Sequence, residues 1–241
     1  MTETLLRLAG VQTHIGRYHI LHGVDLDVPA GRTTVLLGRN GAGKTTTLRT
    51  IMGLWRPSAG DISFGGRDTT RMETPDIARL GIAYVPETMG VFTQLTVREN
   101  FLLATKAGKF DAARLARVFA LFPILKQKFD DAAGGLSGGQ KQMLSVARAM
   151  LEPCRFLVVD EPTKGLAPGV INQLIEAFRL LREADTTILL VEQNFHMARS
   201  VGDTVAVMDD GRVVHAGGMA ELAADEALQA RLLGLSLASH Q

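Results

Sequence analysis

A short glycine-rich segment near residue 40 carries the clearest chemical signal in this sequence. Residues 38–45 fit G-x-x-x-x-G-K-[ST], the Walker A pattern for phosphate binding. Its glycines let backbone N–H groups converge on a phosphate, and a following helix N-terminus adds a favourable dipole. We expect Lys44 to reach the β- and γ-phosphates and Thr45 to supply a hydroxyl ligand to Mg²⁺. The predicted nucleotide contacts are Gly38, Arg39, Asn40, Gly41, Ala42, Gly43, Lys44, Thr45 and Thr46.

A second chemical signal is a pair of carboxylates at the end of an apolar run. Residues 156–159 are Phe-Leu-Val-Val and lead directly into Asp160 and Glu161. Such a strand ends at the carboxyl edge of a sheet, where open α/β folds bind ligands. We expect Asp160 to hold Mg²⁺ through water, and Glu161 to act as general base or to position the attacking water. Alone, this run would indicate an ordinary strand end, and the upstream phosphate-binding pattern favours the catalytic interpretation.

The hydrophobic pattern predicts the scaffold that positions these residues. A buried strand at 33–37 precedes the glycine-rich segment and a helix at 44–52 follows it, which gives a strand-loop-helix unit. Strands and helices alternate again after residue 154, with strands at 155–159, 187–191 and 205–208 and helices at 169–183 and 195–201. This alternation predicts an α/β fold with a parallel doubly wound sheet.

Two other regions have a different character. Partial alternation at 5–8 and 24–28 predicts short strands of an antiparallel lobe. Helical patterns dominate the segment from 88 to 150, at 97–107, 111–122 and 139–150. We therefore expect a helical lobe inserted between two parts of the sheet, and a short helix with a frayed end after residue 219.

Composition limits the classes of protein to which the chain can belong. With 241 residues it is long enough for one α/β domain with an inserted lobe. The 26 Lys and Arg against 25 Asp and Glu give a net charge of +1, so there is no general electrostatic reason to bind nucleic acid. The single cysteine, Cys154, excludes an internal disulfide framework. No apolar run is long enough to span a bilayer, and residues 1–10 lack the features of a secretory signal.

One further motif narrows the kind of nucleotide-binding protein. Residues 136–140 read Leu-Ser-Gly-Gly-Gln and begin a predicted helix, and they resemble the ABC signature sequence. Alone, a Ser-Gly-Gly helix start is a common cap. Its position before the carboxylate pair, and the helix that follows it, identify the chain as similar to ABC transporter ATP-binding subunits. Four more segments resemble the LivF-type ATPase of branched-chain amino-acid importers: Val85-Pro86-Glu87, residues 95–100, residues 160–168 and residues 191–194.

The resemblance implies a fold and a domain organisation. The fold would be that of a P-loop NTPase, with a RecA-like parallel-sheet core, an N-terminal antiparallel β lobe and an inserted helical signature subdomain. Residues 1–241 would form a single nucleotide-binding domain, with the core at 1–87 and 151–241 and the helical subdomain at 88–150.

The resemblance also implies cofactors, partners and location. The cofactors would be ATP and Mg²⁺. The signature residues Ser137, Gly138, Gly139 and Gln140 would close the ATP bound to a second ATPase subunit, with a heterodimer favoured over a homodimer. Two transmembrane permease subunits and, indirectly, an extracytoplasmic substrate-binding protein would complete the assembly, and nucleic acid would not be a partner. The chain would lie peripherally on the cytoplasmic face of the plasma membrane, with residues 86–93 as a docking surface for a permease or as a loop packed locally.

Several positions depart from the general ABC pattern. Glu87 stands where a glutamine is usual and would bind Mg²⁺ more strongly, but an ionised carboxylate cannot donate a hydrogen bond. Gln193 stands in the place of the switch histidine and can still donate to the γ-phosphate as a catalytic group, without a charge. Ile15 occupies the position of the ring that stacks on adenine, and His14 or Tyr18 could substitute for it.

Alternative functions remain open at the level of sequence. The same chemistry would serve an importer of urea, amides or aromatic acids. An exporter of lipid or lipopolysaccharide is disfavoured by Ala167-Pro168 and Gln193. A repair or regulatory ABC protein that binds nucleic acid would carry two cassettes or a long coiled-coil insertion, and the sequence has neither.

Overall fold

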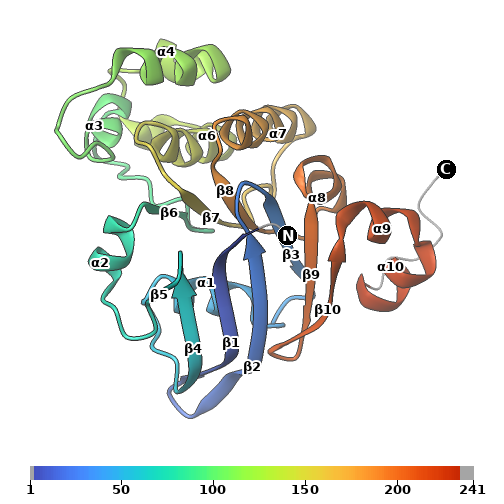
Figure 1. Ribbon diagram of the computed structural model, residues 1–241. Coiled ribbons are helices and arrows are strands. Elements are labelled where there is room, and N and C mark those ends of the chain that lie inside the picture. Colours follow the sequence, from blue (N-terminus) through green and yellow to red (C-terminus); the bar gives the residue numbers. More distant parts are fainter. Residues whose placement is uncertain (1–2, 234–241) are drawn as a thin grey trace.

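A six-stranded, mainly parallel sheet forms the centre of the molecule. The computed structural model describes residues 3–233 (Figure 1). The strand order is β10-β9-β3-β8-β7-β6, and all neighbours are parallel except the edge pair β10 and β9. The bounds are β3 (Thr33–Gly38), β6 (Ile82–Val85), β7 (Phe156–Asp160), β8 (Thr187–Val191), β9 (Thr204–Asp209) and β10 (Arg212–Gly218). The predicted α/β class and parallel core are therefore confirmed.

An antiparallel sheet of four strands packs below this core. Its order is β2-β1-β4-β5, with β1 (Thr4–Ile15), β2 (Tyr18–Pro29), β4 (Ala59–Phe64) and β5 (Arg67–Asp68). The lobe was predicted, but the bounds 5–8 and 24–28 were too short, because both strands continue to the hairpin turn between Ile15 and Tyr18. Gly10 and Gly23 have φ values of +60° and +96°, so they interrupt the sequence alternation at shifts in register while the pairing continues.

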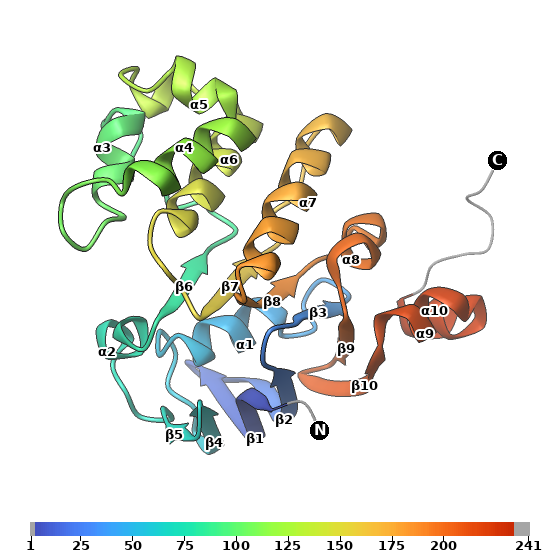
Figure 2. The ribbon, with the colours of Figure 1, turned by 45° about the horizontal axis from the view of Figure 1, so that its top comes forward.

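Strict alternation along the central strands divides the interior into two cores. In β3, Val35 and Leu37 face one cluster and Leu36 faces the other. The first cluster joins the sheet to α6 (Gly138–Met150), α7 (Pro168–Glu183) and α8 (Phe195–Val201). The second joins it to α1 (Lys44–Ile51) and the antiparallel sheet. Both faces of the central sheet are thus covered, as Figure 2 shows, which explains why its strands read as continuous apolar runs.

Helices α3 to α6, called here the helical lobe, lie at one end of the sheet beside α7 (Figure 1). The bounds of the first three are α3 (Val97–Leu102), α4 (Ala112–Leu121) and α5 (Pro123–Gln127). The prediction of α3 as 97–107 was too long, since the Thr96 and Glu99 capping box starts the helix correctly but it ends at Leu102. Turns follow, and Gly108 has a φ of +62°. The short 3₁₀ helix η1 (Ala133–Gly135) then leads into α6.

The remaining elements were less visible in the sequence. The structure adds α2 (Thr74–Arg79), α9 (Met219–Ala224) and α10 (Glu226–Leu233). The expected helix after residue 219 is present as two short helices, and the expected frayed end falls on residues 234–241, outside those described. Within residues 3–233, no helix combines the length and apolar character needed to cross a bilayer.

Candidate functional site

The glycine-rich loop lies between the end of β3 and the start of α1. At Gly38, with φ of +147°, an added Cβ would lie 2.3 Å from the Met208 carbonyl oxygen. At Gly43, with φ of +102°, it would lie 2.9 Å from the Leu21 side chain. These close approaches require glycine at both positions, so the loop keeps a shape in which its backbone can surround a phosphate.

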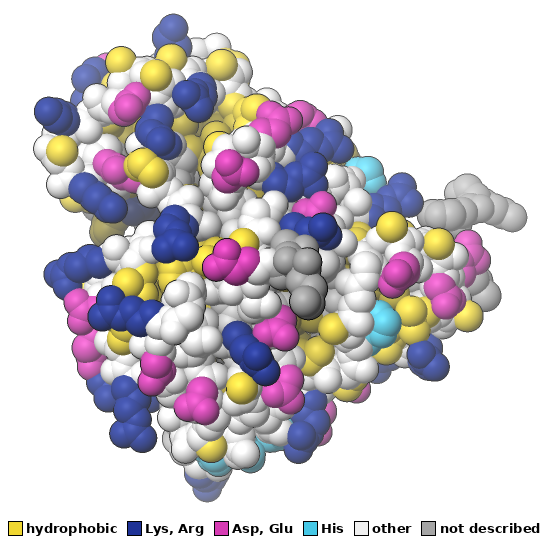
Figure 3. Space-filling view, in the orientation of Figure 1, with side chains coloured by type: hydrophobic (Ala, Val, Ile, Leu, Met, Phe, Trp, Pro, Cys, Tyr) yellow, Lys and Arg dark blue, Asp and Glu magenta, His cyan; other side chains and the backbone are white. Residues whose placement is uncertain are grey.

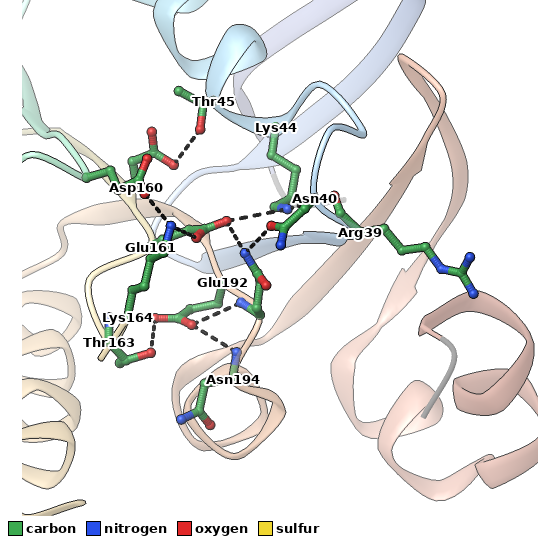
Figure 4. Close-up of polar contacts among 12 residues, drawn as sticks. Arg39, Asn40, Lys44, Thr45, Asp160, Glu161, Thr163, Lys164, Glu192 and Asn194 are labelled. Atoms are coloured by element: carbon green, nitrogen blue, oxygen red, sulfur yellow. Dashed lines mark hydrogen bonds and ion pairs between the residues drawn. The ribbon is translucent and has the colours of Figure 1, made fainter. Parts of the chain in front are cut away.

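Lys44 is held inside this loop. Its side chain is 4% exposed, and Nζ donates to the carbonyl oxygens of Gly38 at 2.9 Å and Arg39 at 3.1 Å. The ammonium also lies 3.5 Å from Glu161 Oε1. In contrast, the Arg39 side chain points away from this cluster in Figure 4. The loop therefore presents one fixed cation at the position where phosphate would bind, and Arg39 contributes through its backbone.

Thr45 and Asp160 meet across the interface between α1 and β7. The Thr45 hydroxyl donates to Asp160 Oδ1 at 3.1 Å, while Asp160 Oδ2 is buried without a hydrogen-bond partner. In residues 3–233 no three His, Cys, Asp or Glu side chains are grouped to hold a metal ion by themselves. Mg²⁺ usually takes one or two protein ligands and completes its shell with water and phosphate oxygens. A hydroxyl beside an unsatisfied carboxylate oxygen fits that ion.

Burial of Asp160 has an electrostatic consequence. Removal from water raises the pKa of this carboxyl to about 6, and the charges of Glu161 and Glu87 raise it further against the Thr45 hydrogen bond. The folded protein therefore binds more protons than the unfolded chain between pH of about 4 and about 6. Through this group, the stability of the nucleotide-free protein falls as pH rises across that window and stays reduced above it.

The D160N variant tests this electrostatic cost. We expect D160N to raise the free energy of unfolding of the nucleotide-free protein above about pH 6, by up to about 3 kcal/mol. The gain should shrink as pH falls toward about 4, because the wild-type carboxyl is then neutral as well. Urea denaturation at several pH values measures it, with the exposed Asp61→Asn as control. A D160N variant no more stable than wild type at pH 8 would contradict the argument.

Glu161 is the first residue beyond β7 and has an unusual backbone. Its φ is +45°, a left-handed conformation that costs about 1 kcal/mol or more for a non-glycine residue. Its N–H donates to the Val191 carbonyl at 2.9 Å, which fixes the turn. The carboxylate then accepts a hydrogen bond from Gln193 Nε2 at 2.6 Å (Figure 4). Strained backbone held by tertiary contacts is a feature of functional sites, and here it aims one carboxylate at the phosphate-binding loop.

Gln193 links three segments of the site. Besides Glu161, its Nε2 donates to Asn40 Oδ1 in the glycine-rich loop at 2.7 Å. The structure thus brings together Lys44, Glu161 and Gln193, the three predicted catalytic residues. Glu87 lines the same pocket, but its carboxylate accepts a hydrogen bond from Lys164 at 2.6 Å. Lys164, which the sequence analysis did not single out, also lies 4.0 Å from Glu161.

The pocket over the loop has a volume of about 330 Å³ and combines charged and apolar walls. Its lining residues are Ile20, Asn40, Gly41, Gly43, Lys44, Thr45, Thr46, Glu87, Glu161 and Lys164. Neither candidate for the adenine-stacking ring is among them. The His14 ring instead stacks on the His19 ring, with 4.1 Å between the ring centres, and Tyr18 is 61% exposed. Ile20, half-buried on β2, is the apolar side chain that the structure offers, and no motif pointed to it.

The signature residues lie elsewhere in the chain. Ser137 caps α6: its hydroxyl accepts from Gln140 N at 3.3 Å, and Gln140 Oε1 accepts from Ser137 N at 3.0 Å. Ser137 and Gly138 are exposed, and the lining of the phosphate pocket within residues 3–233 does not include them. The start of this helix therefore faces outward, available to another molecule.

The far end of α6 holds the loop of residues 86–93. The Ser145 hydroxyl donates to the Met89 carbonyl at 2.5 Å, and Arg148 Nη1 donates to the Gly90 carbonyl at 2.5 Å. The Arg148 guanidinium also lies 5.4 Å from the centre of the Phe92 ring. Beside this loop, a pocket of about 380 Å³ opens between the helical lobe and the sheet core. Met89 and Gly90 line it, while Phe92 is 50% exposed.

A glycine-rich loop that cages a lysine, with a buried acid and a strained glutamate on the adjoining strand, defines a P-loop nucleoside triphosphatase. The family model described as "ABC transporter" matches residues 21–164. The chain belongs to the ABC transporter family, as an ATP-binding domain with ATPase activity.

Individual relatives agree with this assignment. The chain is 37% identical over 212 residues to the high-affinity branched-chain amino acid transport ATP-binding protein BraG of Pseudomonas aeruginosa, covering 87% of this chain and 91% of that protein. It is 34% identical to a probable branched-chain amino acid transport ATP-binding protein LivF of Archaeoglobus fulgidus, over 96% and 99% of the two chains. It is also similar to the ADP conformation of an ATP-binding cassette of an ABC transporter, with 26% identity, a TM-score of 0.80 and coverage of 97% and 100%.

Proposed function

We propose that this chain binds and hydrolyses Mg-ATP as the nucleotide-binding subunit of an ABC importer for branched-chain or related amino acids. The observation that carries the hydrolytic part is the Glu161 carboxylate, which lies between Lys44 and Gln193 beside the Thr45 and Asp160 pair. Similarity to BraG and LivF over most of the chain supports import as the direction of transport and amino acids as the substrate.

In this proposal the glycine-rich loop, Lys44, Glu161 and Gln193 divide the chemistry among them. The backbone of the glycine-rich loop binds the phosphates, and Lys44 neutralises the β- and γ-phosphate charge. Glu161 accepts a proton from the attacking water or orients it, and Gln193 fixes the Glu161 carboxylate and reaches the γ-phosphate. Geometry supports this division, because Lys44 and Gln193 both contact the Glu161 carboxylate.

Mg²⁺ would be held by Thr45 and Asp160 and would neutralise charge that develops on the phosphates. The unpartnered Asp160 Oδ2 supports this assignment. Glu87 remains a candidate third ligand on the condition that its carboxylate leaves Lys164, to which it is ion-paired.

A second ATPase subunit would complete the ATP site. The outward-facing signature residues, from Ser137 to Gln140, would contact ATP bound to the partner, and the partner's signature would contact ATP bound here. Exposure of Gly138 and the separation of α6 from the phosphate pocket support this arrangement. A heterodimer is favoured by the resemblance to importers that pair two different ATPases.

Permease subunits would dock at the pocket beside residues 86–93, which places the chain on the cytoplasmic face of the membrane. The exposed Phe92 ring and the pocket of about 380 Å³ support a receiving surface for a short helix. On the face in Figure 3, basic and acidic side chains are interspersed, which gives that face no strong preference for a polyanion. We also propose that residues 88–150 form the helical subdomain and that 1–87 and 151–241 form the core.

The cargo itself is the least constrained part of the proposal. An importer of urea, amides or aromatic acids would use the same ATPase chemistry, and an exporter of lipid or lipopolysaccharide is the less favoured alternative. An extracytoplasmic binding protein would select the substrate. A ligand screen of the binding protein that works with this chain's transporter would distinguish these cargoes.

Mixing experiments test the proposed composite site. ATP hydrolysis by the purified chain should increase at least about 10-fold when a matching second ATPase subunit is added, because each ATP then meets a complete site. The Gly138→Asp variant should bind ATP as well as wild type but lose about half or more of that increase. Nothing lies within 4 Å of an added Cβ at Gly138, so the variant should fold, yet it would bring a carboxylate to the partner's phosphates.

Colorimetric release of phosphate measures the rate, and the exposed Glu176→Gln variant on α7 serves as control. A rate that is unchanged on mixing, and unchanged by Gly138→Asp, would make the chain complete by itself and would overturn the shared-site proposal.

A further inference from the structure

Glu192 is a buried carboxylate whose role the motifs do not explain. It directly follows β8, is 1% exposed and accepts four hydrogen bonds. Oε1 accepts from Thr163 N at 3.2 Å and from the Thr163 hydroxyl at 2.8 Å. Oε2 accepts from the backbone N–H groups of Gln193 and Asn194, both at 3.0 Å. Figure 4 shows this carboxylate between Thr163, in the loop after β7, and Asn194, in the loop after β8.

These four bonds join the two segments that carry the proposed chemistry. Thr163 lies in the loop that begins with Glu161, and Gln193 lies in the loop after β8. The two loops meet a second time where Gln193 Nε2 donates to Glu161 Oε1 at 2.6 Å. The Glu192 carboxylate thus fixes the backbone on both sides of the Glu161 and Gln193 contact.

The bonding pattern requires an ionised acid at this position. Burial raises the pKa of Glu192, and the four donors oppose this shift by stabilising the charged form. A carboxylate accepts on both oxygens, whereas an amide accepts on one and donates from the other. Glutamine would therefore turn an NH₂ group toward backbone N–H groups on one side, and at least one of them would lose its acceptor.

We propose that Glu192 is a positioning residue for ATP hydrolysis, which holds the Gln193 amide on the Glu161 carboxylate. The proposal rests on the roles proposed above for Glu161 and Gln193. Glu192 itself does not line the pocket of about 330 Å³ over the glycine-rich loop, and it has no hydrogen bond to the Thr45 and Asp160 pair among the described residues. It lines a separate pocket of about 260 Å³ beside Gly38, Arg39 and Asn40. It acts through the orientation of the residue that follows it.

The main test is the E192Q variant, assayed in the assembly in which the wild-type chain hydrolyses ATP. We expect kcat to fall at least 10-fold, while KM and the affinity for a mant-labelled ATP change less than about 3-fold. Thr163→Val removes one of the four bonds and keeps the backbone N–H, so it should lower kcat by a smaller factor. Thr34→Val, which removes the hydrogen bond between the Thr34 and Thr204 hydroxyls, controls for loss of stability and should keep wild-type kcat.

A double-mutant cycle separates positioning from a general structural effect. If Glu192 acts through Gln193, then E192Q combined with Gln193→Ala should be no slower than the slower single variant. Two fully multiplicative effects, or an E192Q kcat equal to wild type, would overturn the proposal. E161Q is measured in parallel: an active E161Q would show that the proposed catalytic role has failed, whereas an inactive E161Q beside an active E192Q would show that only the positioning role has failed.

Discussion

Replacing Glu161 with glutamine should lower the rate of ATP hydrolysis about 100-fold or more at the site built on this chain, while ATP binding is retained. A positioned general base contributes about 10²- to 10⁴-fold to proton-transfer steps, and the amide cannot accept a proton. Glutamine has the shape of glutamate and can still accept the hydrogen bond from Gln193, so the backbone at φ of +45° should be preserved. The loss is therefore expected in kcat.

Release of phosphate measures the rate of ATP hydrolysis, and titration with mant-ATP measures the affinity for ATP. The exposed Glu176→Gln variant, which loses only an ion pair with Arg179 on the surface of α7, should keep both at wild-type values. E161Q that hydrolyses ATP at the wild-type rate would show that Glu161 is not the base at this site.

Replacing Lys44 with alanine should weaken ATP binding about 100-fold or more. The ammonium is held by two carbonyl oxygens at 2.9 and 3.1 Å and faces the pocket, so it is already oriented for phosphate. Without it, the triphosphate would lie beside a Glu161 carboxylate that has lost the cation at 3.5 Å and keeps only Lys164 at 4.0 Å. Loss of the Lys44 cation and exposure of the Glu161 carboxylate therefore both weaken ATP binding.

Titration with mant-ATP in the absence of hydrolysis gives the affinity, and Lys128→Ala on the helical lobe is the control for removal of a lysine that is ion-paired to Asp131. Lys44→Arg should fail as well, because the larger guanidinium does not fit a side-chain site that is 4% exposed. Wild-type affinity in Lys44→Ala would remove this residue from the phosphate site. Together, Lys44→Ala and E161Q separate the binding of ATP from its hydrolysis.

Sequence alone predicted the parts of the site whose chemistry is local. The residues of the glycine-rich loop are consecutive in the chain, and so are Asp160 and Glu161, so residue type and spacing were enough to predict each of the two motifs. Pairings between distant segments were not predictable in this way. Lys164 and Glu87 are 77 positions apart and gave no joint signal before the fold brought them together. The ion pair bears on the predicted role of Glu87 as a Mg²⁺ ligand, because its carboxylate is already paired with a cation, Lys164.

Glu192 shows a signal that could have been used. An acid that directly follows the buried run Thr-Ile-Leu-Leu-Val must be either exposed at the strand end or satisfied by donors. The left-handed backbone of Glu161 had no such signal, because it depends on a bond to Val191 from another strand. Among the fold elements, β6 was missed because its four residues are too few to show a period. The edge strand β10 was missed because it is largely exposed or half-buried.

Helix α6 carries the signature residues at its first turn. Nearer its other end it donates hydrogen bonds to the loop of residues 86–93. Ser137 and Ser145 are separated by two turns of helix, about 12 Å along the axis. In the proposed assembly, a permease that displaced Met89 or Gly90 would therefore act on the helix that carries Gly138 at its other end. In the reverse direction, a second subunit that closed on Gly138 would act through the same helix on the loop of residues 86–93.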